Sequence, residues 1–320
     1  QSYNLIFRDT QGKNICDIDT DTKANNGHNI LETKLILVAF AAYKLTQAFP
    51  DNLFTLDLTL GFNLKEKEIR IANGVISGAK HRVEIDKICH RHDLKYWLCS
   101  GTLLGCVRHG GYIPWDDDLD IEMLREDYEK LLKILPEELP EHLKLQTPDT
   151  DSGYFFQFAK VRDTRSYMEE TNDYDRIFQF KGIFIDIFPY EKMPLPLLWI
   201  SNRTFGRVYK VMNNPNNTPE QLLRKVRRIR KFNERFIFPV LRVVAKLWPT
   251  KYLNYSPGIP YPNTILPQET FPLTTAMFDG VEVPVPADTD AYLRRKFGNY
   301  MQLPPLDNIH PHSAKLTIND

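Results

Sequence analysis

The sequence predicts an α+β fold, in which a small N-terminal α+β accessory domain precedes a larger domain built on a mixed sheet with flanking helices. From residue 78 onward, stretches with the helical period of 3.6 residues alternate with apolar stretches typical of buried strands. The residues before that point are short strand-like runs separated by turns that contain Gly, Asn and Gln. We therefore expect two domains, at 1–76 and 77–320.

In the accessory domain, residues 31–48 have the pattern of a helix, and four short runs have the pattern of strands. The strand-like runs are 4–7, 14–17, 53–58 and 67–71. No pattern in this part points to chemistry, so the sequence leaves its function open.

In the main domain, a helix is expected around residues 83–89, where apolar residues form a stripe, and a second helix at 126–135. Residues 195–250 have a helical pattern rich in basic residues, whereas 271–320 reads as extended and is punctuated by prolines. The predicted sheet strands are 96–100, 119–122, 154–161 and 183–188.

Composition excludes several classes of protein. Lys and Arg number 41, as do Asp and Glu, and a chain without net charge lacks the positive field that collects nucleic acid. The four cysteines form no C-x-x-C pair, which excludes a zinc ribbon and a thioredoxin motif. Three of them lie in apolar stretches and favour a reducing compartment. The longest apolar run, 35–43, is far shorter than the roughly 20 residues of a spanning helix.

The run DDDLD at 116–120 is the most informative stretch of the sequence. Residues two apart on a strand point to the same face, so Asp118 and Asp120 can share a cation. Their oxygens suit Mg²⁺. Such runs are ordinarily solvated turns, but the apolar residues on either side predict that these acids end a buried strand. There, two like charges repel one another unless a cation lies between them.

A third acid, Asp186, is the single charge in the apolar core of the run KGIFIDIFP at 181–189. A buried carboxylate without a partner is costly. We expect Asp186 either to complete a two-metal site with the acidic pair or to pair with an Arg of the helical region.

The run SGTLLG at 100–105 lies between a predicted strand and a short helix. Glycine at such a turn lets a phosphate approach the backbone closely, and the start of a helix offers free N–H groups. The pattern is common by itself, but here it comes shortly before the acidic pair. Gly101 and Thr102 are therefore candidates for binding nucleotide phosphates.

Together these runs resemble the LicD family of phosphocholine transferases, which includes fukutin and fukutin-related protein. The central part of the resemblance is HDLKYW at 92–97, SGTLLG at 100–105 and RHGGYIPWDDDLDI at 108–121. Further matching runs follow in order, namely KVRDT at 160–164, IDIFP at 185–189 and the tail from FDG at 278–280. The resemblance covers about residues 80–312 and leaves out the first 75.

The resemblance implies a nucleotidyltransferase-like fold and an enzyme that transfers a phospho-alcohol from a CDP-linked donor, CDP-choline first, to a cell-surface glycan. Lipopolysaccharide, teichoic acid and capsule are the expected acceptors, in a bacterial protein. Asp118, Asp120 and Asp186 are the expected catalytic residues and the ligands of Mg²⁺, with Mn²⁺ as the alternative. A CDP-polyol (ribitol or glycerol) donor is a second choice.

Four basic residues near these motifs are candidates for contact with the donor's phosphates or with CMP, namely Arg108, His109, Lys160 and Arg162. Arginine suits bidentate phosphate contact, and Lys160 and Arg162 share one face of a predicted strand. Three aromatic residues are open either to packing or to a cage for choline, namely Tyr112, Trp115 and Tyr154.

Residues 224–251 interleave basic and apolar residues. A basic amphipathic helix is typical of contact with a membrane surface, and an ordinary solvated helix face is the alternative. Because acceptors in the resembled family are frequently lipid-linked, we expect a cytoplasmic protein that is peripheral on the inner face of the plasma membrane.

Two further functions stay open. The Asp-x-Asp pattern also occurs in glycosyltransferases that hold a nucleotide sugar through a metal, but a longer βαβ region usually precedes it there than the one helix and strand expected here. A glycan-binding protein without activity is the other, and the three acids argue against it.

Overall fold

The computed structural model describes residues 3–8, 14–20, 82–113, 116, 118–261, 263–303 and 313–318. The chain divides into two compact units, Gln1–Ile69 and Arg70–Asp320. In the first unit, the described residues form one antiparallel pair, β1 (Tyr3–Arg8) with β2 (Asn14–Thr20), at two of the predicted strands. The other predicted elements of the accessory domain, and its predicted boundary at 76, lie outside the described residues.

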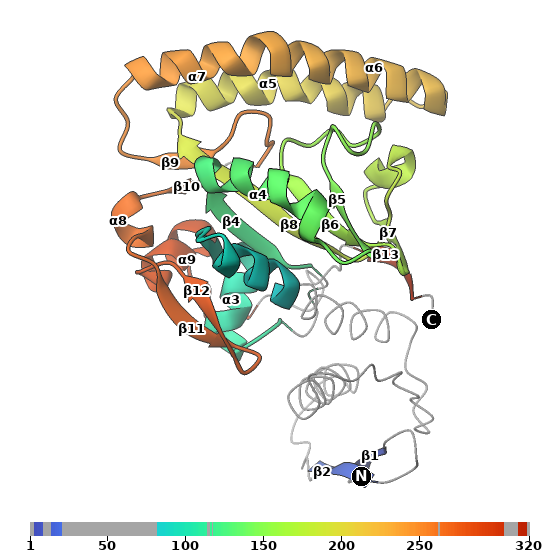
Figure 1. Ribbon diagram of the computed structural model, residues 1–320, viewed down its shortest axis with the longest axis vertical. Coiled ribbons are helices and arrows are strands. Elements are labelled where there is room, and N and C mark those ends of the chain that lie inside the picture. The colour runs from blue at the N-terminus through green and yellow to red at the C-terminus, as the bar shows by residue number, and fades with distance from the viewer. Residues whose placement is uncertain are drawn as a thin grey trace. The chain divides into compact units, whose positions relative to one another are not determined.

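A seven-stranded mixed sheet organises the second unit (Figure 1). Its central strand β8 (Phe184–Lys192) pairs in parallel with β4 (Asp120–Leu124) and antiparallel with β6 (Ala159–Asp163). The outer strands are β3 (Tyr96–Leu98) beside β4, β5 (Leu143–Gln146) beside β6, and β9 (Leu253–Tyr255) with β10 (Thr264–Ile265) beyond β8. This mixed sheet with its helices confirms the predicted α+β class.

Helices precede and follow β3 and β4, the strands next to the predicted phosphate-binding and acidic runs. A helix at 82–91 precedes β3 and buries Ile85, Ile88 and Cys89, as the apolar stripe predicts. Helix α3 (Ser100–His109) follows β3 almost at once, and α4 (Arg125–Glu138) follows β4 and packs against β4, β5 and β8. The short connections from β3 to α3 and from β4 to α4 fix where the ends of these strands lie.

Three helices form a layer over the rest of this unit, as predicted for 195–250 (Figure 1). They are α5 (Leu195–Met212), α6 (Pro219–Phe232) and α7 (Phe238–Leu247). A capping box of Thr218 and Gln221 starts α6. One π-helical turn joins α6 to α7 next to Pro239, which has no N–H to continue the α-helical pattern. Among the described residues, no helix is both long and apolar enough to cross a bilayer.

The segment at 154–161 differs from the prediction, since the strand begins only at Ala159. The residues before it are aromatic, and aromatic residues favour strands. Here their rings pack as a plug instead: Phe155 and Phe156 contact Phe178, and Phe156 stacks on Phe205 of α5. The backbone of Tyr154 donates to Asp151 O in a turn rather than to a neighbouring strand.

The C-terminal part is only partly extended. A hairpin of β11 (Thr274–Phe278) and β12 (Val281–Val285) turns through Asp279 and Gly280, both with positive φ. The predicted extended chain is wrong for α9 (Thr289–Phe297), which Asp288 caps and which packs against α3 and the short α8 (Pro267–Thr270). The last strand, β13 (Ser313–Ile318), pairs with β7 (Ser166–Glu170).

Candidate active site

Three neighbouring strands bring charged side chains together. Asp120 on β4 pairs in register with Asp186 on β8, and Lys160 on β6 pairs with Asp186 from the other side. Lys160 Nζ lies 2.8 Å from Asp186 Oδ1 and donates a hydrogen bond to Oδ2 at 3.0 Å. The partner of Asp186 is therefore a lysine from the adjacent strand, and the expected Arg of the helical region is not involved.

Lys160 balances the charge of these carboxylates only in part. Asp186 Oδ1 is close to the ammonium group but outside hydrogen-bonding geometry, so this buried oxygen accepts no hydrogen bond. Burial raises the pKa of Asp186 despite the lowering effect of Lys160. Burial, followed by the charges of Asp118 and Asp186, raises the pKa of Asp120 well above its usual range, and Lys296 and Lys160 oppose that rise.

These groups open into a cleft of about 720 Å³. Its charged lining consists of five acids and two amines, from Asp116, Asp118, Asp120, Glu170, Asp186, Lys160 and Lys296. Its wall is aromatic and consists of Phe156, Phe158, Phe184, Phe188, Tyr255, Tyr261 and Phe297. The two parts meet at Lys160, whose Nζ lies 3.3 Å from the centre of the Phe184 ring. A site that combines charges and rings suits a ligand that is part phosphate and part apolar or cationic.

The first turn of α3 forms one side of the cleft, through Ser100 and Gly101. This turn has neither a side-chain cap nor an acid, which favours an anion at the helix start. A Cβ on Gly101 would lie 2.6 Å from Asp116 Oδ2, so glycine here lets that carboxylate reach the helix. The run 100–105, predicted as a turn before a helix, is thus the beginning of the helix itself.

Thr102 does not face the cleft, so it cannot contact a phosphate there as predicted. Its side chain is buried, and its hydroxyl accepts a hydrogen bond from the Asp120 backbone N–H at 2.8 Å. Thr102 is absent from the residues that line the cleft. It ties α3 to the start of β4 and so fixes where Asp120 stands.

Arg108 and His109 occupy the last turn of α3, before Gly110 ends the helix in the left-handed conformation. A helix of ten residues is about 15 Å long, so its two ends cannot serve one phosphate. Arg108 Nη1 donates to Tyr300 O at 2.9 Å. Burial and then Arg108 lower the pKa of His109 to about 4. Neither residue lines the cleft.

Arg162 shares a face of β6 with Lys160, as the alternation predicts, but lies deeper in the protein. It is fully buried and donates to Gln146 Oε1, to Gly182 O and to Glu170 Oε1. Glu170 lines the cleft, whereas Arg162 does not. Arg162 therefore positions a residue of the rim.

The aromatic wall is made of residues other than the candidates for a choline cage. Tyr112 is packed on Phe278 at 4.9 Å between ring centroids, and Tyr154 is fully buried among Phe156, Phe158 and Phe178. Neither lines the cleft, and Trp115 lies outside the described residues.

Lys296 is a site residue that the sequence did not reveal. It comes from α9, donates a hydrogen bond to Ser100 Oγ, and lowers the pKa of Asp120 by its charge. The run RRKFGN at 294–299 belongs to the tail that contributes to the family resemblance, but an extended tail gave no reason to place it at the acids. The packing of α9 against α3 brings it there.

The donor set suits a hard cation such as Mg²⁺, although no three Asp, Glu, His or Cys side chains form a ready-made metal cluster in the part of the chain that the structure describes. Asp118, Asp120 and Asp186 line one cleft, and Asp186 Oδ1 has no hydrogen-bond donor. A cation would relieve the repulsion that raises the pKa of Asp120. It would compete with Lys160 for Asp186.

Comparison with known proteins agrees with this geometry. Residues 93–247 match the family model described as "LicD/FKTN/FKRP, nucleotidyltransferase domain". The chain is 27% identical over 241 residues to lipopolysaccharide cholinephosphotransferase LicD of Haemophilus influenzae, which covers 70% of this chain and 89% of that protein.

Two shorter matches are closer in sequence. An uncharacterized protein of Rickettsia prowazekii, RP689, is 57% identical over 47 residues, or 15% of this chain and 18% of that protein. Human ribitol 5-phosphate transferase FKRP is 53% identical over 34 residues, or 11% of this chain and 7% of that protein. The matched region holds α3, β4, β6 and β8, whereas α9, which brings Lys296 to the cleft, lies beyond it. Residues 93–247 therefore form a nucleotidyltransferase domain of the LicD type.

Proposed function

We propose that this protein transfers a phospho-alcohol, phosphocholine as the first choice, from a CDP-linked donor to a hydroxyl of a cell-surface glycan. One observation carries the proposal: the register of β6, β8 and β4 gathers Lys160, Asp186 and Asp120 in a cleft with an aromatic wall. Phosphoryl transfer depends mainly on positioning and on charge stabilisation, and this cleft offers groups for both.

In the proposed reaction, a glycan hydroxyl attacks the phosphorus that carries the alcohol. The bond from that phosphorus to the CMP oxygen breaks, so a phosphodiester to the glycan forms and CMP leaves. The proton of the hydroxyl passes to Asp186, whose Oδ1 accepts no hydrogen bond. Lys160 and Lys296 contact the phosphoryl oxygens, where the charge lies.

Asp118, Asp120 and Asp186 would hold Mg²⁺, or Mn²⁺ in its place. When bound, the metal neutralises charge on the diphosphate. Gly101 leaves space at the start of α3, which the Asp116 carboxylate approaches, and Thr102 acts through the backbone of Asp120. Arg162 acts through Glu170, whereas Arg108 and His109 have no direct part in this scheme because they lie at the other end of α3.

The aromatic wall supports choline as the transferred alcohol, because a quaternary ammonium is attracted to ring faces. The long match to a cholinephosphotransferase agrees with it. The short match to a ribitol 5-phosphate transferase makes a CDP-polyol the second donor to test. Lipopolysaccharide is the first acceptor to test, because the Haemophilus relative is named for it. Teichoic acid, capsule and lipid-linked sugars follow.

We place the protein in the cytoplasm, peripheral on the inner face of the plasma membrane. Cys89, Cys99 and Cys106 are free thiols, which agrees with a reducing compartment. The basic run at 224–251 supports contact with an anionic surface.

The deciding assay measures nucleotide release in the presence of Mg²⁺. CDP-choline, CDP-ribitol, CDP-glycerol, CTP and UDP-sugars are compared, with and without lipopolysaccharide or teichoic acid. We expect glycan-dependent release of CMP from a CDP-alcohol, and loss of that release after chelation. Release of UDP alone would replace the proposal by the glycosyltransferase alternative, and binding of glycan without release of any nucleotide would favour the non-catalytic one.

Asp118→Ala tests the acidic pair directly. We expect it to abolish release of CMP while the protein stays folded, because it removes a charge from a repulsive group of acids. Glu126→Gln is the matched control, since it removes one exposed negative charge from α4 outside the cleft. An unfolded Asp118→Ala protein would assign Asp118 a structural role instead.

A further inference from the structure

The outward face of the helical layer, α5 with α6 and α7, is divided into an apolar half and a basic half. The inward faces are ordinary protein core: Leu197 and Leu198 of α5 pack with Phe238, Leu241 and Ala245 of α7. Because these contacts hold α7 beside the first half of α5, the outward faces of the two helices lie next to each other (Figure 1).

The apolar half consists of the first part of α5 together with α7 and the residue after it. Its exposed side chains are large: Trp199 is 76% exposed and Leu247 is 81% exposed. The other members are between 46% and 60% exposed and include Ile200, Val240, Val243 and Trp248. So many large, exposed apolar side chains on two helices that pack together mark an interaction site rather than ordinary solvent contact.

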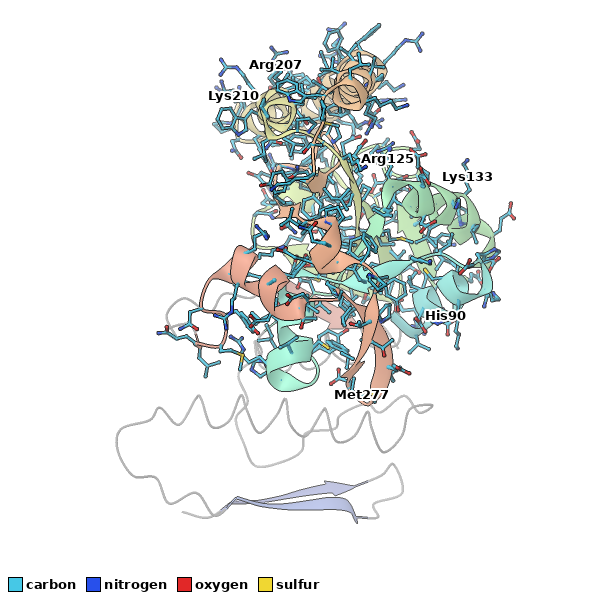
Figure 2. The ribbon with its side chains drawn as sticks, turned by 90° about the vertical axis from the view of Figure 1, so that its left-hand side faces the viewer. His90, Arg125, Lys133, Arg207, Lys210 and Met277 are labelled. Carbon is cyan, nitrogen blue, oxygen red and sulfur yellow. The ribbon has the colours of Figure 1, made fainter. Side chains whose placement is uncertain are left out.

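The basic half consists of the second part of α5 together with α6. Arg203, Arg207 and Lys210 are the exposed residues of α5 here, and Figure 2 shows Arg207 and Lys210 on the outer side of that helix. On α6, the groove beside Leu223 is lined by Arg224, Arg227, Arg228 and Lys231, with Glu220 at one end. The outward face is therefore mainly apolar on α7 and the first part of α5, where Lys246 is an exposed cation, and mainly cationic on α6 and the second part of α5, where Phe232 is an exposed ring.

The charge of this layer decides which partner fits. Residues 195–251 contain thirteen Lys or Arg and two Asp or Glu. Glu234, one of the two acids, pairs with the buried Arg230 on the same helix. A second copy of this chain would bring the same positive charge to the interface, which opposes self-association. An anionic bilayer offers acyl chains to the apolar half and phosphate headgroups to the basic half.

We infer that α5, α6 and α7 form a docking surface for anionic phospholipid membranes, in which the apolar half inserts and the basic half binds headgroups. The sequence predicted contact through 224–251, and this inference adds α5, whose Trp199 has the amphipathic ring that is enriched at membrane interfaces. This inference is about the membrane to which the protein binds. It holds whichever CDP-linked donor the cleft binds.

The test is flotation of the full chain with two kinds of vesicle, phosphatidylcholine alone and phosphatidylcholine mixed with phosphatidylglycerol. We expect binding to the mixed vesicles that weakens with salt, because exposed charges are screened. Replacing both Trp199→Gln and Leu247→Gln should lower the partition coefficient by about tenfold or more. Replacing both Arg207→Gln and Lys210→Gln should lower it by about tenfold on the mixed vesicles only.

Two matched controls lie on other elements of the same unit (Figure 2). Met277→Gln removes an apolar side chain that is 57% exposed on β11, and Lys133→Gln removes an exposed charge on α4. Neither should change binding. Quenching of tryptophan fluorescence by brominated lipid should fall in Trp199→Phe, if that ring enters the bilayer.

Three outcomes would overturn the inference. They are no binding to either vesicle, equal binding by all variants, and a dimer in solution that Trp199→Gln with Leu247→Gln dissolves. Release of CMP from a soluble donor should be unchanged in every variant when no vesicles are present. Vesicle binding without any such release in the wild type would refute the proposed function and leave the docking surface intact.

Discussion

Strand β4 carries two acids on one face, two residues apart, and they stand in opposite surroundings. Glu122 is fully buried and accepts hydrogen bonds from Trp97 Nε1 and Tyr255 OH at 2.8 Å, from Tyr292 OH at 2.9 Å and from Asn263 Nδ2 at 3.1 Å. Asp120 lines the cleft and faces Asp118 and Asp186, and among the described residues no donor reaches its carboxylate.

The difference separates a structural acid from a functional one. The donors around Glu122 compensate its burial and join β3, β4, β9 and α9 behind the cleft. At Asp120, Lys296 and Lys160 offset only part of the effect of burial and of the neighbouring acids, which costs stability and favours a bound cation. A buried acid ordinarily has hydrogen-bond donors around it, as Glu122 does. An exception such as Asp120 is typical of an active site.

The largest expected effect is that of Asp120→Asn on activity. Release of CMP should fall by about thousandfold or more, since one ligand of the proposed metal is lost. Stability should not fall, because a repulsive charge is removed and the Thr102 contact uses only the backbone. Initial rates and urea unfolding without Mg²⁺ measure both. A variant that is clearly less stable than the wild type would place Asp120 with the structural acids.

Glu122→Ala should have the opposite result. Several buried donors lose their acceptor, and we expect a loss of about 3 kcal/mol in the free energy of unfolding. The activity of the protein that remains folded should change little, because Glu122 does not line the cleft. Urea unfolding and rates per folded molecule check this. Full stability in the variant would mean that the network around Glu122 does not hold these strands together.

Asp279 is a third acid in the comparison, with fewer hydrogen-bond donors than Glu122 and weaker repulsion from other acids than Asp120. Burial raises its pKa from 3.8 to about 6, although Arg82 and a backbone hydrogen bond from Tyr112 lower it. Because the folded-state pKa is the higher one, the contribution of this group to stability is complete below about pH 3.8 and is lost as the pH rises through about 6.

We therefore expect Asp279→Asn to remove a decrease of about 2 kcal/mol in unfolding free energy between pH 4 and neutral pH. Urea unfolding as a function of pH measures the decrease in both proteins. Parallel curves for the variant and the wild type would show that Asp279 is solvated like an ordinary acid.

Lys296→Gln has the smallest expected effect and tests the cationic side of the cleft. The Michaelis constant for the donor should rise about tenfold, while the turnover number changes less, if Lys296 binds a phosphate. Arg295→Gln is the control, because Arg295 is on the same helix but pairs with Glu269 outside the cleft. Equal effects of the two substitutions would mean that α9 contributes general charge rather than a specific contact.

The motif strands and the helical part could be predicted well from sequence, because each depends on local patterns. The apolar run around Asp186 and the helical period of 195–250 rest on neighbouring residues. The predicted strand alternation of Asp118 and Asp120 is wrong, because β4 begins only at Asp120. The aromatic run at 154–158 and helix α9 were predicted less well. Burial against distant residues decides their conformation, and no local pattern contains that information.

Separation along the chain is a poor guide to which residues lie in the cleft. Arg108 and His109 are close to the acids in sequence, but a full helix separates them from the cleft. Lys296 is distant in sequence and reaches Ser100 at the helix start. Contact between side chains depends on how elements pack and much less on their separation along the chain.

Local patterns already predict the chemistry available to this protein: two acids at the start of β4, a third acid in an apolar strand, and a block that resembles LicD proteins. Which of these groups meet depends on the packing of distant segments. Pairing of β4, β8 and β6 brings Asp120, Asp186 and Lys160 into register, and the packing of α9 adds Lys296. Both depend on hydrogen bonds and burial between distant segments, which composition and periodicity do not encode.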